Sequence, residues 1–208
     1  DWFKINVKGK GGHGSAPHEC IDALVVASSI VMNLQNIVSR QANPLDPLVL
    51  TIGMLNSGSR FNVIAENATM EGTTRCFNPE LRKQLPEMME KIINNIASGY
   101  GADASLEYNF ILSPTINDKA CSNIAQKAAS KIVGEEGVIN FEKITGGEDF
   151  SFFLEKAPGA LAFVGCRNEE KCACYSHHNG NFNIDEDALE IGTKLYVNYA
   201  IDYLNSHK

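Results

Sequence analysis

Long hydrophobic segments are missing from this sequence of 208 residues. The longest apolar run, near Ala23–Ala27, is far shorter than the ~20 residues that cross a bilayer, so we expect no membrane span and no membrane partner. Blocks of like charge are missing too. The 18 Lys and Arg against 25 Asp and Glu give a net charge of −7, and an acidic surface disfavours nucleic-acid binding. The apolar fraction of 44% excludes disorder and predicts an ordinary globular chain.

An initiator methionine and a signal-like apolar stretch are also absent. The chain starts with Asp1, and residues 2–8 alternate at once between apolar and polar side chains, as in a half-buried strand. We therefore expect the chain to begin inside a longer protein.

A disulfide framework is not indicated by the six cysteines. Those at positions 20, 76 and 121 lie among apolar neighbours and are predicted to be reduced, which fits a cytoplasmic protein. Cys166, Cys172 and Cys174 could instead close a structural zinc site with His178. Because Cys-x-Cys is not the usual zinc-knuckle spacing, the signal for this site is weak.

Apolar periodicity in the first half predicts the order strand, helix, strand, strand, helix, strand. These elements cover residues 2–8, 21–40, 48–54, 68–76, 78–97 and 104–110. The order is that of a ferredoxin-like α+β fold, with two helices on one face of a four-stranded antiparallel sheet. Ser113-Pro114 marks a boundary, so residues 1–113 are predicted to form a domain.

Residues 114–208 have too few strands to build a sheet alone. Helices are predicted at residues 119–133 and 185–205, with a short helical turn at 150–155. The apolar run Gly159–Gly165 predicts a strand buried on both faces. We interpret this half as the C-terminal part of an α/β domain whose other strands are missing, and we expect it to expose apolar sheet edges and to be mobile or associated with another chain.

Three clusters carry residues suited to chemistry. His13 lies in a glycine-rich turn that would expose its imidazole. Asn62 and Arg75 could together hold a carboxylate, because a guanidinium offers two parallel donors. His178 follows the predicted buried strand, where α/β sheets place ligands, and could bind a metal. Each cluster alone also fits an idle surface turn, a solvated arginine, or a polar loop before a helix that Asp185 caps.

Taken together, the clusters resemble the M20 metallopeptidases. The resemblance is to the amidohydrolase branch, which contains hippurate hydrolases, N-acyl-L-amino acid amidohydrolases and auxin conjugate hydrolases. It rests on six segments in order along the whole chain: residues 9–18, 34–40, 61–64, 72–75, 146–151 and 178–186.

This resemblance implies an α/β zinc-peptidase-like catalytic domain interrupted by a ferredoxin-like lid that often forms a homodimer. Residues 1–113 would be the lid, and 114–208 the C-terminal portion of the catalytic domain. Two divalent metal ions, zinc or manganese, would activate water to hydrolyse the amide bond of an N-acyl amino acid or a small peptide.

The resemblance also implies roles for single residues. His13 matches a histidine that helps to polarise the carbonyl, in some members from the partner subunit. Asn62 and Arg75 match residues that contact the oxyanion or the product carboxylate. Gly147 and Glu148 match a substrate-side loop, and His178 matches a metal ligand.

Most metal ligands of the family, and its carboxylate base, lie in an N-terminal segment that has no counterpart here. We therefore expect this chain alone to be inactive, although the longer protein would be an amidohydrolase. The alternative is a stand-alone dimerisation or binding module built on the ferredoxin-like sheet.

Overall fold

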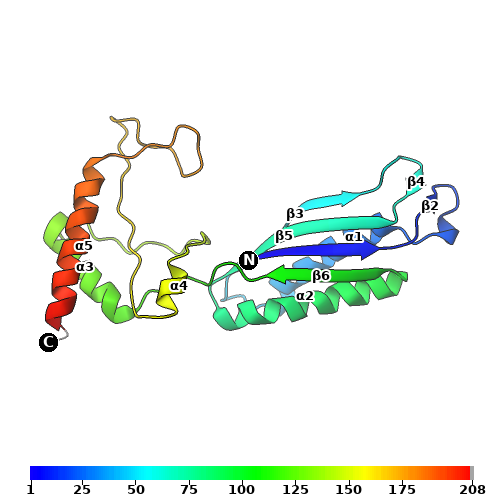
Figure 1. Ribbon diagram of the computed structural model, residues 1–208, viewed down its shortest axis with the longest axis horizontal. Coiled ribbons are helices and arrows are strands. Elements are labelled where there is room, and N and C mark those ends of the chain that lie inside the picture. The colour runs from blue at the N-terminus through cyan, green and yellow to red at the C-terminus, as the bar shows by residue number, and fades with distance from the viewer. Residues whose placement is uncertain (207–208) are drawn as a thin grey trace. The chain divides into compact units, whose positions relative to one another are not determined.

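The computed structural model describes residues 1–206, which form two compact units (Figure 1). The first unit comprises Asp1–Pro114 together with Thr145–Glu148, and the second comprises Thr115–Ile144 and the residues from Asp149 onward. The segment Thr145–Glu148, which the sequence assigns to the second domain, thus packs with the first unit.

The first unit is built on a four-stranded antiparallel sheet with the order β3-β5-β1-β6. Its strands are β1 (Trp2–Lys8), β3 (Leu48–Ser57), β5 (Asn67–Cys76) and β6 (Asp103–Asn109). Two long helices cover one face: α1 (Ala23–Asn36), which continues as η2 (Ile37–Gln41), and α2 (Pro79–Tyr100) (Figure 1). This arrangement confirms the predicted ferredoxin-like fold.

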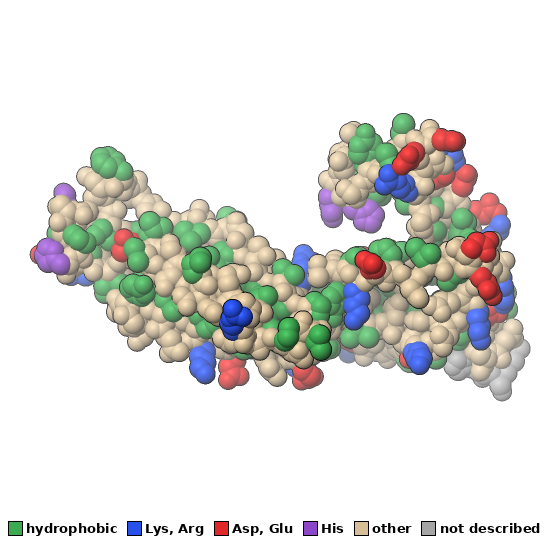
Figure 2. Space-filling view, turned by 180° about the vertical axis from the view of Figure 1, so that it is seen from behind, with side chains coloured by type: hydrophobic (Ala, Val, Ile, Leu, Met, Phe, Trp, Pro, Cys, Tyr) green, Lys and Arg blue, Asp and Glu red, His purple; other side chains and the backbone are tan. Residues whose placement is uncertain are grey.

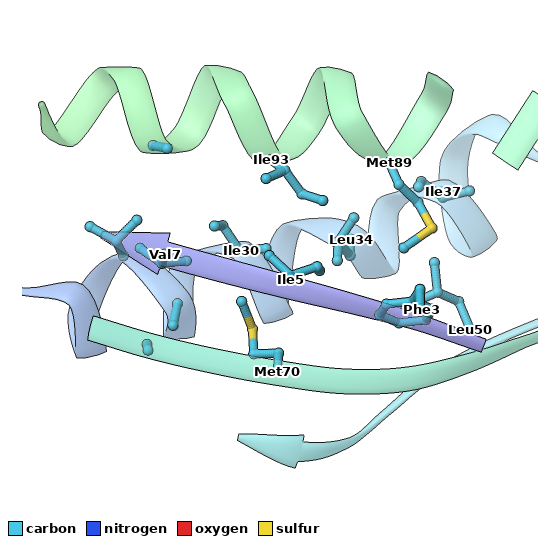
Figure 3. Packing of buried hydrophobic residues seen from close by; sticks show 14 of the residues in the cluster. Phe3, Ile5, Val7, Ile30, Leu34, Ile37, Leu50, Met70, Met89 and Ile93 are labelled. Atoms are coloured by element: carbon cyan, nitrogen blue, oxygen red, sulfur yellow. The ribbon is translucent and has the colours of Figure 1, made fainter. Parts of the chain in front are cut away.

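Strict alternation along the strands creates the core of the first unit. Phe3, Ile5 and Val7 of β1 point toward the helices and are almost fully buried, as is Met70 of the neighbouring strand β5 (Figure 3). They pack against apolar side chains that recur at helical spacing on α1 and α2 (Figure 3). Burial of each large side chain contributes about 1.5–3 kcal/mol, so this core accounts for the stability of the unit.

Capping residues fix where both helices begin. Asp22 accepts a hydrogen bond from the N–H of Leu24 at the start of α1. Asn78 accepts from two backbone N–H groups at the start of α2, where Pro79 occupies the first turn, as the sequence predicts. Gly101 ends α2 in the left-handed conformation.

A buried ion pair ties the two ends of this unit's chain together. Both carboxylate oxygens of Asp1 accept hydrogen bonds from the Arg82 guanidinium, each at 2.8 Å. Arg82 also donates to the hydroxyl of Ser113 at 2.9 Å. The first strand, α2 and the segment that leaves the unit are therefore held at one point.

The second unit consists mainly of two packed helices, α3 (Lys119–Val133) and α5 (Asp187–Ser206), with the short α4 (Ser151–Leu154). α5 has no buried residue, and the face turned away from α3 exposes large apolar side chains. They are Leu189, Tyr196, Val197, Ile201 and Leu204. Among residues 1–206, no helix is long and apolar enough to cross a membrane.

The predicted buried strand at Gly159–Gly165 is wrong. The segment has no regular secondary structure, and Phe163 is 51% exposed. Its backbone is tethered instead by Asn117, whose side chain exchanges two hydrogen bonds of 2.8 Å with Leu161. A strand needs a partner to satisfy its backbone groups, and the described part of the second unit offers none. The exposure of this apolar run agrees with the expectation that this half lacks part of its core.

Gly72 provides a test of the packing in the first unit. A Cβ there would collide with the carbonyl oxygen of Thr51 and with the ring of Phe3. We expect Gly72→Ala to lower the free energy of unfolding of this unit by about 1–3 kcal/mol, as overpacking does, measured by urea denaturation. Gly99→Ala in α2 is the control, because among residues 1–206 no atom outside its own helix backbone and chain neighbours lies within 4 Å of its Cβ position. Equal effects of both substitutions would contradict this packing.

Candidate functional site

His13 and Asn62 lie close together at one end of the first unit. The two-residue strands β2 (Gly12–His13) and β4 (Val63–Ile64) pair antiparallel, with His13 opposite Val63. The N–H of Gly14 donates to the carbonyl of Asn62 at 2.9 Å. We call the two turns that carry these residues, 12–16 and 58–64, the loop tip.

The imidazole of His13 has a defined orientation. Its Nδ1 accepts from the backbone N–H of Ser15 at 3.1 Å and lies 2.7 Å from the hydroxyl of the same residue. Because a backbone N–H can only donate, the proton of the neutral ring is on Nε2. His13 is exposed, so this N–H is available to a carbonyl or oxyanion of a ligand.

Neighbouring atoms approach the backbone of this turn so closely that only glycine fits. A Cβ on Gly14 would lie 2.9 Å from the Asn62 carbonyl oxygen, and one on Gly12 would collide with the sulfur of Cys20. The glycines around His13 therefore allow the two turns of the loop tip to meet. A shallow hollow of about 620 Å³ adjoins them, lined in part by Asp22, Arg60 and Phe61.

Arg75 and Gly147 lie at the other end of the first unit. The Nη1 group of Arg75 donates to the carbonyl of Thr145 at 2.9 Å, and a Cβ on Gly147 would lie 3.7 Å from the same nitrogen. Glu148 follows in this segment and is exposed. The structure thus brings Arg75 and the Gly147–Glu148 segment together, and Arg75 remains exposed enough to bind an anion.

The sheet separates these two groups of residues. β5 begins just after the loop tip, and Arg75 stands eight residues beyond its first residue, Asn67. Eight strand residues span about 26 Å. His13 and Asn62 therefore cannot contact the same small ligand as Arg75 within one copy of the first unit.

His178 lies in the second unit, in a turn with a strained backbone. Its φ of 64° is in the left-handed region, and among residues 1–206 the only other non-glycine residue with a positive φ is Cys172. Such outliers concentrate at functional sites, so this strain supports a role for His178.

A cluster of charges around the half-buried Asp185 fixes the loop before α5. Lys171 contacts Asp185 at 2.6 Å and Asp187 at 2.7 Å. Hydrogen bonds from Lys171 and from Asn168 lower the pKa of the Asp185 carboxyl to about 2. The same carboxylate raises the pKa of the Lys171 ammonium. Both groups are therefore charged throughout the neutral range.

The described residues do not fit a two-metal site. No group of three or more His, Cys, Asp or Glu side chains comes close enough to hold a metal ion anywhere in residues 1–206. This also leaves the zinc hypothesis for Cys166, Cys172 and Cys174 without structural support. We derive no chemical step through a metal from this chain.

One further surface was missed by the analysis of single motifs. No charged residue occurs in 23–39, which contains α1, or in 48–59, which contains β3. Both elements nevertheless expose apolar side chains, among them Met32 at 70% and Met54 at 53%. We call the surface formed by α1 and the outer edge of β3 the charge-free side. The sequence signal for this surface is an absence of charged residues. Candidate functional residues, by contrast, are recognised by residue types that are present.

Figure 2 shows the contrast with the rest of the unit. Hydrophobic and uncharged polar side chains cover α1, whereas Lys, Arg, Asp and Glu project along α2. α2 carries six charged residues in its 22 positions: Glu80, Arg82, Lys83, Glu87, Glu90 and Lys91. The second sheet edge, β6, carries Asp103 and Glu107.

Comparison with known proteins places this architecture in a family. Residues 1–101 match the model of the M20 peptidase dimerisation domain. Over 206 residues the chain is 38% identical to thermostable carboxypeptidase 2 of Saccharolobus solfataricus, covering 99% of this chain and 52% of that protein. It is 35% identical to an N-acetylcysteine deacetylase of Bacillus subtilis, covering 100% of this chain and 53% of the relative.

A solved structure shows the same fold. The crystal structure of a dinuclear metal-binding M20 peptidase from Bacillus subtilis superimposes with a TM-score of 0.79 at 31% identity, over 98% of this chain and 49% of that one. The chain spans about half the length of the relatives it matches. Its residues 1–101 correspond to the M20 peptidase dimerisation domain, and the chain as a whole is similar to M20 peptidases.

Proposed function

We propose that this chain is the dimerisation and substrate-contacting half of a metal-dependent amidohydrolase. The observation that carries the proposal is the charge-free side of the first unit. A solvent-exposed helix normally carries charges on its outer face, as α2 does. Depletion of charge with exposed apolar side chains is typical of the centre of a protein–protein interface.

The geometry of the sheet favours a second copy of the chain as the partner. β3 is a ten-residue edge strand without charge or proline, the kind of edge that pairs with another strand. The commonest homodimer has a two-fold axis, which relates identical strands antiparallel to each other. Pairing of two β3 edges would produce one continuous sheet and bring the α1 helices together.

This pairing would also assemble a site from two copies. In each copy, Ser57 of β3 leads into the loop tip, whereas Val49 of β3 lies directly beside Arg75 of β5. Antiparallel pairing places the Ser57 end of one β3 beside the Val49 end of the other. His13 and Asn62 of one copy would then approach Arg75 of its partner, which removes the separation of about 26 Å found within one copy.

The residues so assembled suit an N-acyl amino acid. Arg75 has the planar donor geometry that binds a carboxylate. The Nε2–H of His13 and the side-chain amide of Asn62 can donate to the acyl carbonyl and stabilise the negative charge that develops on its oxygen. The deacetylase among the relatives acts on an N-acyl amino acid, which supports this substrate class.

The water-activating part of the reaction lies outside this chain. In the longer protein, divalent metal ions would activate the water and polarise the carbonyl. The described residues bring no three metal ligands together, and the second unit leaves the apolar face of α5 uncovered. We infer a cytoplasmic amidohydrolase in which α5 packs against a sheet that the chain does not contain, with His178 as one metal ligand.

A second candidate is a stand-alone dimerisation module. The same charge-free side favours it, and it requires no second half. The two candidates differ in what the second unit does: a module would leave the strained backbone of His178 without a role.

The dimer interface can be tested with a single charge. Met32→Lys places a cation in the middle of the charge-free side without removing a buried side chain, because Met32 is 70% exposed. We expect it to convert a dimeric chain to a monomer, since two like charges would be desolvated across the two-fold axis. Sedimentation equilibrium or light scattering coupled to gel filtration measures the outcome.

Asn94→Lys is the matched control for this experiment. It introduces the same side chain at an exposed position of α2, on the charged side of the same unit. We expect this variant to remain dimeric. A monomeric parent chain, or loss of the dimer in both variants, would rule out the interface.

Activity gives a second test. We expect the 208-residue chain to show no hydrolysis of N-acetylcysteine or hippurate with added Zn²⁺ or Mn²⁺, because residues 1–206 bring no three metal ligands together. Product release would be followed by chromatography, with a full-length M20 amidohydrolase as the positive control. Turnover that disappears with His178→Ala would show that the chain itself contains a working centre.

A further inference from the structure

Two apolar side chains of the first unit stand out by their exposure. Phe61 is 103% exposed and Leu45 is 86% exposed, the highest values among the large hydrophobic residues in the described chain. Phe61 lies in the loop tip, and Leu45 lies in the turn between η2 and β3. Leu45 precedes β3 in the sequence and Phe61 follows it. Neither side chain contributes to the core of the first unit.

Both side chains are presented by ordered turns. The N–H of Leu45 donates to the side chain of Asn43 at 3.0 Å, and the N–H of Asp46 donates to the Asn43 carbonyl at 2.8 Å. Pro44 and Pro47 restrict the same turn.

The turn that carries Phe61 is closed in a similar way. The N–H of Val63 donates to the Arg60 carbonyl at 3.3 Å, and the Asn62 carbonyl accepts from Gly14. A backbone that is ordered before binding loses less entropy on association, so both turns are suited to present an anchoring side chain.

The two residues also lie in turns outside β3, at equal sequence distances from Gly53. Gly53 lies at the bulge in the middle of this strand, where the register with β5 shifts between Ile52 and Met54. Leu45 precedes Gly53 by eight residues, and Phe61 follows it by eight. Apart from its chain neighbours, no atom of residues 1–206 lies within 4 Å of the Gly53 Cβ position, so this part of the strand is open to a close neighbour.

We propose that Phe61 of one copy packs against Leu45 of the second copy, and that the dimer axis passes near Gly53. An antiparallel pair of β3 edges centred on Gly53 would bring the turn that follows β3 in one chain, with Phe61, to the end of β3 that Leu45 precedes in the other. Two-fold symmetry makes the contact twice, once at each end of the interface. The inference rests on the proposed β3 dimer and adds its register and its anchoring side chains.

The contact would close the assembled site on its outer side. Phe61 is adjacent to Asn62, and Leu45 lies at the end of β3 that borders Arg75. Docking of Phe61 therefore fixes the loop tip of one copy beside Arg75 of the other. The partner's contribution to the site then depends on an apolar contact that touches neither His13 nor Arg75.

The energetic test is a double-mutant cycle on the dimer dissociation constant, measured by sedimentation equilibrium. We expect Phe61→Ala and Leu45→Ala each to raise this constant about tenfold or more, as apolar hot-spot residues do. The dissociation constant of the double variant should be little higher than that of the weaker-binding single variant, because both substitutions remove the same contact. Tyr100→Ala, at the exposed end of α2, is the control and should leave the constant unchanged.

A positional test uses p-benzoyl-phenylalanine in place of Phe61. Ultraviolet irradiation should cross-link two chains, and peptide mapping should place the link in residues 42–48 of the second chain. The same photoreactive residue in place of Met32 tests whether the dimer forms, independently of the Phe61–Leu45 contact.

Cross-linking from position 32 but not from position 61, or additive effects in the cycle, would overturn the Phe61–Leu45 contact while leaving the dimer intact. Absence of cross-linking from both positions in a monomeric chain would overturn the dimer and the contact with it.

Discussion

The length of the sheet is the constraint on which the functional arrangement depends. The strands of the first unit run between two sets of polar residues, with His13 and Asn62 at one end and Arg75 at the other. No side chain is long enough to bridge about 26 Å of strand, so one copy cannot bring both sets to one substrate. Antiparallel pairing of two sheets solves this problem by symmetry alone, because it reverses the direction of one copy. On the proposed dimer the site requires two copies, because each copy supplies only one of the two sets.

The distribution of charge follows from the same requirement. α1 and α2 have equivalent positions on the sheet and bury similar apolar stripes, yet only α2 carries charges on its outer face. Both helices pack against the same core, so the core does not explain a difference in charge that is confined to their outer faces. The proposed dimer accounts for this difference, because in it α2 faces water and α1 packs against the second copy. The edges of the sheet show the same difference, since β6 carries carboxylates and β3 carries none.

The elements of the first unit could be predicted from the sequence because each is determined locally. The apolar–polar alternation of residues 2–8 and the N-cap at Asn78 are each determined by residues only a few positions away. The structure contains both features, as strand β1 and as the start of helix α2. The run Gly159–Gly165 was assigned wrongly because a strand is determined by its neighbours, and the described second unit supplies none.

The candidate site was only partly predictable for the same reason. The residue types of His13 and Arg75 indicate that they can take part in binding or catalysis. They do not indicate which residues His13 and Arg75 contact. That His13 meets Asn62 through the β2–β4 pair, and that Arg75 contacts Thr145, depends on contacts between distant parts of the chain. The charge-free side is visible in the sequence, but its meaning requires knowing that α1 and β3 are neighbours.

The two units differ in how far they can be stable alone. The first unit encloses a core between a sheet and two helices, which satisfies the layered packing of a domain. The second unit has α3 on one side of α5 and exposed Tyr196 and Leu204 on the other, so its apolar surface is only half covered. An exposed apolar stripe on a helix is stabilised when another layer covers it. The first unit is therefore closed around its own core, whereas the helical layer of the second unit leaves one apolar face open.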